Sequence, residues 1–144
     1  MGSDSTDWTL KSGEEILRVH LHKKFGGSGQ GGINPSNTTP NVFIFSDPET
    51  GHQHGYHDHW KDGAFYYIGE GQRGDQQMIR GNRQILEHKL KGRVIRLFSG
   101  SRGTVTYVGK FQVDDRDPYE LQTAPQMEGG TRKVIVFRLI PDQS

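Results

Sequence analysis

The sequence predicts a mainly β domain of the α+β class. Its 144 residues fit one domain, since domains usually contain roughly 100–200 residues. Only two of these residues are alanine, whereas Val, Ile, Phe, Tyr, Trp and Thr are plentiful, which favours strands over helices. Five segments are rich in β-branched or aromatic residues and are bounded by Gly, Pro or Asp. Five such strands suit a closed or half-closed β-barrel with one or two flanking helices.

A helix is predicted near the N-terminus, over residues 13–25. Ser12 and Glu15 have the spacing of a capping box, and Gly26 provides a stop signal. Five residues between these signals recur at helical spacing and would share one face of a helix: Ile16, Leu17, His20, Leu21 and Phe25. The sequence therefore predicts an amphipathic helix that packs against the sheet.

A polar, glycine-rich stretch follows over residues 26–40 and is expected to be a long surface loop. Apolar spacing predicts a second helix at about 82–90. The expected strands are 41–46, 64–69, 93–98, 104–113 and 133–140. No repeat or linker divides the chain, so we expect one domain, 13–144. It follows a tail, 1–12, whose opening is typical of sequence added for expression.

Basic residues are concentrated in one part of a chain whose formal net charge is only +1. In the window 73–110, nine Lys or Arg residues face two carboxylates, so this window carries +7. Clustered Lys and Arg hold an anionic polymer through its phosphates, whatever the global charge of the protein. The window therefore predicts a phosphate-binding surface, and its alternative is a solvated charged face.

Several function classes can be set aside from composition and motif detail. The chain contains no cysteine, which excludes disulfides, thiol catalysis and Cys-ligated zinc. No apolar run reaches the ~18 residues of a membrane span, and no signal peptide opens the chain, so a cytoplasmic protein is expected. The glycine-rich stretch ends in Ile33-Asn34-Pro35 and lacks the Lys and Ser or Thr of a nucleotide-binding P-loop.

Four histidines lie within eight residues: His52, His54, His57 and His59. Alternate positions on a strand face the same side, so either pair has the spacing of metal ligands on a β-barrel. A cupin-like site also needs a carboxylate a few residues beyond its His-x-His pair, and neither pair is followed by one at that spacing. A polar loop that supplies a few binding residues is the better interpretation, and no metal site is expected.

The segment 55–75 combines aromatic rings, glycines and carboxylates. Dense aromatic residues usually belong to a core, and Phe65 fits that description. Tyr66 and Tyr67 are adjacent, however, so they cannot both point inward from a strand. A free ring beside a basic surface can stack on an unpaired base, and a carboxylate can accept a hydrogen bond from that base's amine. The segment therefore predicts a nucleobase pocket.

Four motifs follow one another between about residues 13 and 140. They are Phe25-Gly-Gly with Gly31-Gly-Ile-Asn-Pro-Ser36; Gly55-Tyr-x-Asp58 with Asp62-Gly-x-Phe-x-Tyr-Ile-Gly-Glu-Gly-Gln-x-Gly-Asp75; Gly81-Asn-x-x-Ile85 with His88; and Arg93-Val-Ile-Arg-Leu-Phe98 with Val105-Thr-Tyr-Val-Gly-Lys-Phe111. In this order they resemble the SRA (SET- and RING-associated, or YDG) domain. The bacterial version, similar to the N-terminal module of McrA-type HNH endonucleases, resembles this chain most.

The resemblance implies a PUA-like β-barrel that flips a modified cytosine out of duplex DNA. Tyr56 and Tyr67 match the rings that sandwich the flipped base, and Asp58 matches the carboxylate that binds the cytosine amine. Ile68 and Gly69 occupy the place of a Thr-Gly pair beside the 5-substituent. Since Ile replaces Thr there, the expected wall of the pocket is apolar and lacks a hydroxyl.

The predicted function is that of a non-enzymatic reader of double-stranded DNA containing 5-methylcytosine or a close relative. It needs no cofactor and acts alone or with a fused or associated HNH nuclease. Phosphate contacts are expected from Lys23, Lys24, Arg73, Arg80, Arg83 and Arg102. Gln72 is expected to fill the gap left by the base. The alternatives are an RNA-binding PUA-like module and a His-metal β-barrel enzyme.

Overall fold

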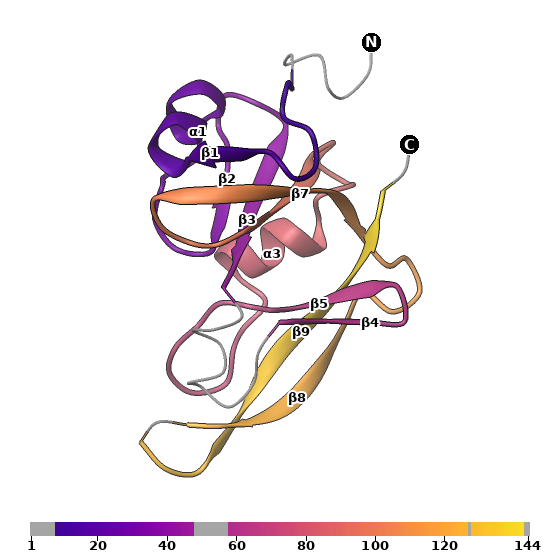
Figure 1. Cartoon of the computed structure of the whole chain (residues 1–144). Coiled ribbons are helices and arrows are strands. Elements are labelled where there is room, and N and C mark those ends of the chain that lie inside the picture. The colour runs from indigo at the N-terminus through magenta and orange to yellow at the C-terminus, as the bar shows by residue number, and fades with distance from the viewer. Residues whose placement is uncertain (1–7, 48–57, 127, 143–144) are drawn as a thin grey trace.

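The computed structural model describes residues 8–47, 58–126 and 128–142. In this part the chain forms a nine-stranded sheet and two helices (Figure 1). The elements are β1 Glu15–Leu17, α1 Arg18–Phe25, β2 Ile33–Pro35, β3 Asn41–Ser46, β4 His59–Lys61, β5 Ala64–Ile68, α3 Arg80–Leu86, β6 Val94–Ser99, β7 Thr104–Val113, β8 Tyr119–Pro125 and β9 Thr131–Pro141. The predicted mainly β fold with two helices is confirmed.

The strands follow the order β2-β3-β6-β7-β9-β5-β4, with β1 beside β7 and β8 beside β9. The β3–β6 pair is parallel and the other pairs are antiparallel. Within the described residues the pairing path ends at β2 and β4, so the sheet is curved but not closed. In Figure 1, α1 and β1 lie at one end of the molecule, β8 and β9 at the other, and α3 between them.

The two larger hydrophobic clusters of the described residues pack the helices against the sheet. The larger one contains Tyr67 of β5 with residues of β3, β6, β7, β9 and α3. The second contains Phe25 of α1 and Phe43 of β3, with Trp8 packed against it. Trp8 is 4.6 Å from Phe25 between ring centroids, so a residue from the predicted tail belongs to the fold. Neither helix of the described part is long and apolar enough to cross a bilayer.

The first helix is shorter than the predicted 13–25. Residues 15–17 instead form β1, in which Glu15 lies opposite Thr106 of β7. The N-cap of α1 is Leu17, which makes no side-chain capping bond, so the capping box does not form. Glu14 accepts a hydrogen bond from the backbone of Lys11 in a turn before β1. Pairing with β7 therefore overrides the local helix signals.

The other elements differ from prediction mainly at their ends. Strands β3 and β7 have the predicted bounds, and β5, β6 and β9 agree within two residues. The second helix runs over 80–86 instead of 82–90, and turns follow it as far as residue 92. The four strands missed are β1, β2, β4 and β8. Three of these have only three residues each, too few for a visible alternation.

His88 ties the end of α3 to β7. It is 3% exposed, its Nε2 accepts from the backbone N–H of Val113 at 3.1 Å, and its Nδ1 lies 2.9 Å from the carbonyl oxygen of Arg93. A backbone N–H can only donate, so Nε2 is unprotonated and Nδ1–H donates to Arg93. Burial is the main cause that lowers the pKa of His88, so the ring is harder to protonate in the fold than in the unfolded chain.

This depressed pKa makes the fold less stable in acid. The unfolded chain takes up a proton on His88 below about pH 6.5, whereas the folded chain resists it, so stability falls as pH decreases from there and levels off below the folded pKa. Urea unfolding at pH 7.5 and 5.5 is expected to show a lower midpoint at pH 5.5. His88→Gln should be less stable at both pH values but should lose less between them. An unchanged loss would contradict this assignment.

Candidate functional site

Asp58 occupies the point where β3 and β5 end. Its Oδ1 accepts from the backbone N–H of Ile68 at 2.7 Å, and its Oδ2 accepts from the hydroxyl of Ser46 at 2.5 Å. Burial raises the pKa of Asp58, and the bonds from Ile68 and Ser46 and the neighbouring His59 oppose that rise. Each oxygen keeps a free lone pair. The carboxylate is therefore oriented, poorly solvated and able to accept a further hydrogen bond.

Tyr67 lies beside this carboxylate but belongs to the core. It is 3% exposed, and its hydroxyl is 3.1 Å from the carbonyl oxygens of both Gly32 and Phe45. Burial, together with the charge of Asp58, raises the pKa of Tyr67 well above its ordinary value, so it remains a hydrogen-bond donor. Tyr67, which the resemblance matches to a ring of the base sandwich, is therefore the member of the tyrosine pair that points toward the core.

Ile68, the next residue of β5, contacts Asp58 through its backbone. Successive residues of β5 face opposite sides of the sheet, so the Ile68 side chain packs with Tyr66 against a separate cluster of β8 and β9 residues. Only its backbone N–H reaches Asp58. The Ile68 side chain and the Tyr67 ring therefore lie on opposite faces of β5. Tyr66 is the half-buried member of the tyrosine pair and stacks on His59 at a centroid distance of 5.2 Å.

The glycine-rich loop, residues 26–32, is well ordered by one buried amide. The Oδ1 of Asn34 accepts from Ser28 Oγ and from the N–H of Gly29, and its Nδ2 donates to the carbonyls of Gln30 and Gly31. Asn34 is fully buried, whereas Gln30 is exposed. The loop therefore presents Gln30 from a fixed turn, a placement that no spacing signal in the sequence indicates.

A second ordered loop, residues 69–79, follows β5. Buried Gln76 donates to the carbonyls of Gly69 and Gly71 and accepts from the N–H of Ile135. The side chain of Asn82 in α3 accepts from the backbone N–H of Glu70 and donates to its carbonyl. A Cβ on Gly69 would lie 2.7 Å from the Asn82 Oδ1, so a glycine is required there for packing.

This arrangement leaves Gln72 and Arg73 exposed at the tip of the loop, as the sequence predicts. Arg132 supports the tip from β9, since its Nη1 donates to the carbonyls of Gly71 and Gly74.

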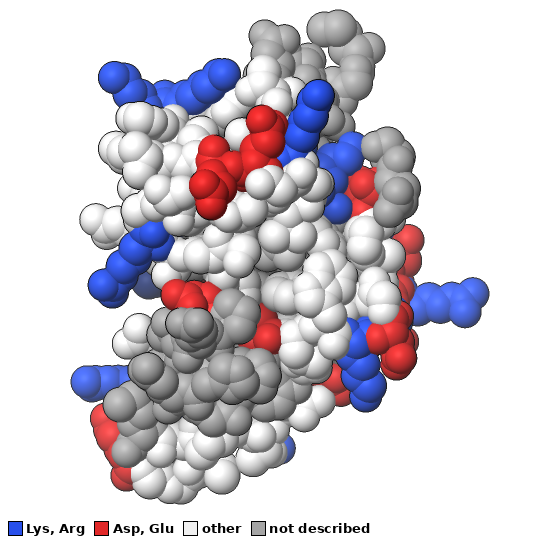
Figure 2. Space-filling view, viewed as in Figure 1, with Lys and Arg blue, Asp and Glu red and all other residues white. Residues whose placement is uncertain are grey.

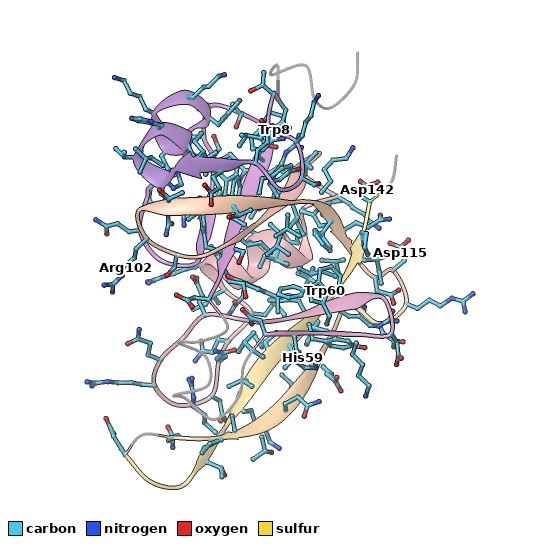
Figure 3. The ribbon with its side chains drawn as sticks, in the orientation of Figure 1. Trp8, His59, Trp60, Arg102, Asp115 and Asp142 are labelled. Carbon is cyan, nitrogen blue, oxygen red and sulfur yellow. The ribbon has the colours of Figure 1, made fainter. Side chains whose placement is uncertain are left out.

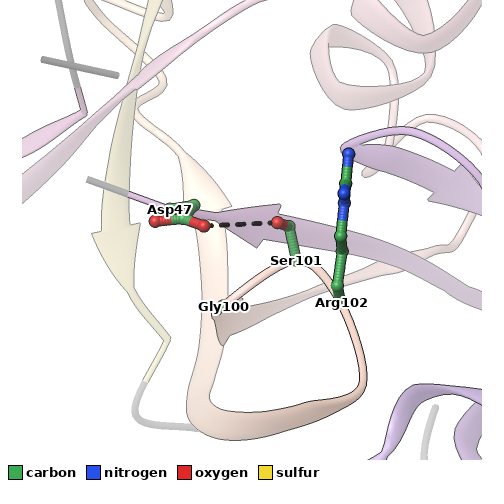
Figure 4. Close-up of a pocket in the computed structure, with 4 residues that line it drawn as sticks. All are labelled: Asp47, Gly100, Ser101 and Arg102. Carbon is green, nitrogen blue, oxygen red and sulfur yellow. Dashed lines mark hydrogen bonds between the residues drawn. The ribbon is translucent and has the colours of Figure 1, made fainter. Parts of the chain in front are cut away.

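The turn between β6 and β7, residues 100–103, forms the third edge of the site. The N–H of Gly100 donates to the carbonyl of Ser46, next to the hydroxyl that holds Asp58. An open hollow of about 460 Å³ is lined by Asp47, Gly100, Ser101 and Arg102. Figure 4 shows Ser101 donating to Asp47 at 3.4 Å, with Arg102 on the other side of Ser101.

Some bases of the window 73–110 are buried or paired with carboxylates. Arg96 is 2% exposed and bonds Asn41 and Tyr107 inside the core. Arg83 pairs with Glu87, and Lys89 pairs with Asp115. Figure 2 shows Lys and Arg side chains spread around the margins of this face instead of in one patch. The prediction of a phosphate-binding surface is therefore wrong for Arg96 and stays a prediction for the exposed bases.

The exposed members of the predicted phosphate set are Lys23 and Lys24 at the end of α1, Arg73, Arg80 at the start of α3, Arg83 and Arg102. Figure 3 shows Arg102 projecting from one margin, whereas Asp115 and Asp142 lie at the opposite margin. Arg102 is thus separated from these two carboxylates.

Two predictions depend on residues outside the described ranges. Tyr56, predicted to stack on the base, lies there, as do His52, His54 and His57. His59 is described and stacks on Tyr66. Among the described residues no three His, Asp or Glu side chains are grouped as a metal site.

Sequence reasoning missed Arg18, which is 8% exposed and lies under two of the three loops. Its Nη1 donates to the carbonyl of Ser101 and its Nη2 to the carbonyl of Gly31. The available signal was helical spacing, since Arg18 shares the buried face of α1 with Leu21 and Phe25.

Solved structures with similar folds support the architecture. The sulfur-binding and SRA domains of ScoMcrA complexed with phosphorothioated DNA align with a TM-score of 0.70 and 23% identity, over 94% of this chain and 41% of that one. ScoMcrA, a type IV phosphorothioation-dependent restriction endonuclease, aligns with a TM-score of 0.66 and 22% identity, over 94% of this chain and 25% of that one. The SUVH5 SRA domain with hemimethylated CG DNA aligns with a TM-score of 0.63 and 22% identity, over 95% and 91%.

The chain thus spans less than half of the ScoMcrA chains and nearly all of the SUVH5 domain. No curated protein matches the sequence. A family model described as the ScoMcrA-like SRA domain matches residues 12–144, which is almost the whole chain. This chain therefore belongs to the ScoMcrA-like SRA domain family.

Proposed function

We propose that this domain binds duplex DNA containing a modified cytosine and receives the extruded base against Asp58. The observation that carries the proposal is the carboxylate itself, which Ser46 and the N–H of Ile68 hold in one orientation. Cytosine presents an N4 amine on its Watson–Crick edge, and a carboxylate is the acceptor that matches it. Asp58 thus supplies recognition of the base.

Extrusion of a base costs a few kcal/mol, which contacts outside the pocket must offset. Lys23, Lys24, Arg73, Arg80, Arg83 and Arg102 are proposed to bind phosphates, with Arg83 the weakest because Glu87 already neutralises it. Gln72 and Gln30 stand on ordered loops and are the two candidates for the gap left in the duplex. A long amide side chain in that gap can bond the orphaned partner base.

The aromatic part of the proposed pocket rests on Tyr56 and Tyr67. Tyr56 is proposed to cover the base, and Tyr67 to form its floor beside Asp58. Since the Tyr67 hydroxyl bonds Gly32 and Phe45, a base that stacks on this ring also depends on the position of the glycine-rich loop. Gly69 contributes through packing against Asn82, and Ile68 through its backbone.

The domain is proposed to be a targeting module without catalytic residues of its own. The ScoMcrA chain that it resembles is a restriction endonuclease of which the match covers 25%. We therefore propose that a fused or associated HNH nuclease cuts the DNA that this domain binds. In a bacterial cytoplasm such a module would act at the nucleoid.

The test is a competition among duplexes of one sequence that contain cytosine, 5-methylcytosine, 5-hydroxymethylcytosine or a phosphorothioate linkage. The phosphorothioate duplex is included because a ScoMcrA structure with this DNA resembles the chain. Selective binding to a cytosine modification is expected, since Asp58 reads a base edge. Equal affinity for all four duplexes would refute the proposal, and selectivity for the phosphorothioate alone would move recognition to the DNA backbone. Tighter binding to RNA of the same sequence would favour an RNA-binding module.

Phosphate contacts predict a salt dependence that one substitution can locate. Log affinity should fall with log salt at a slope of about −0.9 per neutralised phosphate. Arg102→Ala is expected to make this slope shallower by about one phosphate and to weaken modified and unmodified duplexes equally. Arg116→Ala is the control, since Arg116 is exposed beside Asp114 and Asp115. An Arg102→Ala variant that loses only modified DNA would assign Arg102 to the pocket instead.

A further inference from the structure

Arg18 begins α1 and is nearly buried, with 8% of its surface exposed. Its guanidinium stacks on the ring of Phe45, with Cζ 3.7 Å from the ring centroid. Its Nε donates to the Nε2 of His22 at 3.0 Å. Desolvation on burial lowers the pKa of Arg18, but the guanidinium remains charged at neutral pH. A buried cation that stacks on one strand residue is thus fixed in place.

The two remaining nitrogens of Arg18 reach separate loops. Nη1 donates to the carbonyl of Ser101 in turn 100–103 at 2.8 Å, and Nη2 donates to the carbonyl of Gly31 in loop 26–32 at 2.7 Å. The backbone N–H of Arg18 also donates to the carbonyl of Gly103 at 2.7 Å. One side chain therefore sets the separation of two loops that no strand pairing joins within the described residues.

The hydrogen bond from Arg18 to Gly31 of loop 26–32 is connected to the candidate site. Gly32 follows Gly31, and its carbonyl accepts from the Tyr67 hydroxyl and from the N–H of Phe45. The ring of Phe45 lies under the Arg18 guanidinium. A displacement of Gly31 would therefore be passed to Tyr67 through one peptide unit.

A second path leads from Ser101 to Asp58 and contains one more hydrogen bond than the path to Tyr67. Gly100 precedes Ser101, and its N–H donates to the carbonyl of Ser46 at 2.8 Å. The hydroxyl of Ser46 holds Asp58 Oδ2. The two Nη atoms of Arg18 thus support the floor and the carboxylate of the site from opposite sides.

His22 fastens the other end of the glycine-rich loop. Arg18 can only donate, so the His22 Nε2 is the acceptor and its Nδ1–H donates to the carbonyl of Gly26 at 2.8 Å. Loop 26–32 is therefore held at Gly26 by His22 and at Gly31 by Arg18. Among the described residues, all the hydrogen-bond acceptors of Arg18 are uncharged. Arg18 therefore acts in the described structure through directional hydrogen bonds to neutral groups and not through an ion pair.

We propose that Arg18 is a positioning residue that holds loop 26–32 and turn 100–103 as one preformed DNA-binding surface around Asp58. This inference rests on the proposed function for its effect on DNA. Preformed loops bind more tightly because their ordering is complete before DNA arrives. The planar fork of arginine spans two acceptors, which a lysine ammonium cannot do from the same position.

The test compares Arg18→Lys with Arg96→Lys. Arg96 is a matched control because it is also buried, bonds Asn41 and Tyr107, and stacks on a ring, with Cζ 4.1 Å from the Trp8 centroid. Within the described residues it makes no hydrogen bond to either loop. Both variants keep the charge. Arg18→Lys is expected to weaken binding to the preferred modified duplex by about tenfold or more. Its affinity for unmodified duplex should fall less, because that binding depends on charge. Arg96→Lys should keep the wild-type ratio of the two affinities.

Amide hydrogen exchange of the full chain without DNA supplies a second readout. Arg18→Lys is expected to accelerate exchange in residues 26–32 and 100–103, and Arg96→Lys is not. Wild-type exchange in these loops, or a wild-type ratio of affinities, would overturn the positioning role. If the wild-type domain itself binds all duplexes equally, the proposed function fails, while the exchange comparison still decides whether Arg18 orders the two loops.

Discussion

Asp58→Asn is expected to abolish most of the preference for modified cytosine while leaving binding to phosphates intact. The asparagine amide has nearly the same shape, and its oxygen can still accept from the N–H of Ile68. Its NH₂ group can still donate to the Ser46 hydroxyl, but it offers the base amine a donor where an acceptor is needed. Hydrogen bonds to charged groups contribute about 1.5–3 kcal/mol, which corresponds to roughly 10–150-fold in affinity.

The effect should be measured as the ratio of affinities for modified and unmodified duplexes by fluorescence anisotropy. Asp62→Asn is a matched control, because Asp62 is an exposed carboxylate in the β4–β5 turn with φ of 52°, a conformation that asparagine tolerates. Asp62→Asn should keep the wild-type ratio. An Asp58→Asn variant that also keeps it would show that the carboxylate does not contact the base.

Tyr67→Ala is expected to destabilise the fold by about 3–5 kcal/mol, the usual cost of removing a buried aromatic ring. The ring contributes to the largest core cluster, so its loss would leave a cavity among β3, β5 and β9. Tyr67→Phe keeps the ring and removes only the bonds to Gly32 and Phe45, at a cost of about 0.5–1.5 kcal/mol. Urea unfolding measures both values.

The phenylalanine variant separates the structural part of Tyr67 from its part in the site. We expect Tyr67→Phe to remain folded and to bind modified DNA more weakly than wild type, because the glycine-rich loop loses its anchor on the pocket floor. A Tyr67→Ala variant as stable as wild type would show that the ring lies outside the core.

Local sequence signals predicted the long strands of this fold and missed the short ones. The β3 segment is a continuous buried run, and the β7 segment is long and largely alternates between buried and more exposed residues. Both are rich in β-branched and aromatic residues, so their bounds could be predicted from the sequence. Residues 15–17 have helix signals but pair with β7, which lies some 90 positions later along the chain. A contact at such a separation leaves no local pattern, and tertiary pairing overrides propensity.

The residue types of the candidate site could be predicted from the sequence, but the directions in which their side chains point could be predicted only in part. Asp58 and the exposed tip formed by Gln72 and Arg73 could be identified from a long, specific motif. That Tyr66 and Tyr67 face opposite sides followed from the period of a strand, but which of them faces the core depends on the register of β5 on β9. Arg18 was missed because its three acceptors are an imidazole and two backbone carbonyls, which have no sequence signature.

The central claim, that a modified cytosine leaves the duplex to meet Asp58, can be tested with a fluorescent base. A duplex carrying 2-aminopurine next to 5-methylcytosine should brighten when saturated with protein, because extrusion of its neighbour unstacks the probe. The matched unmodified duplex, and the modified duplex saturated with Asp58→Asn, should brighten much less. Saturated binding to the modified duplex without any increase in fluorescence would contradict base extrusion.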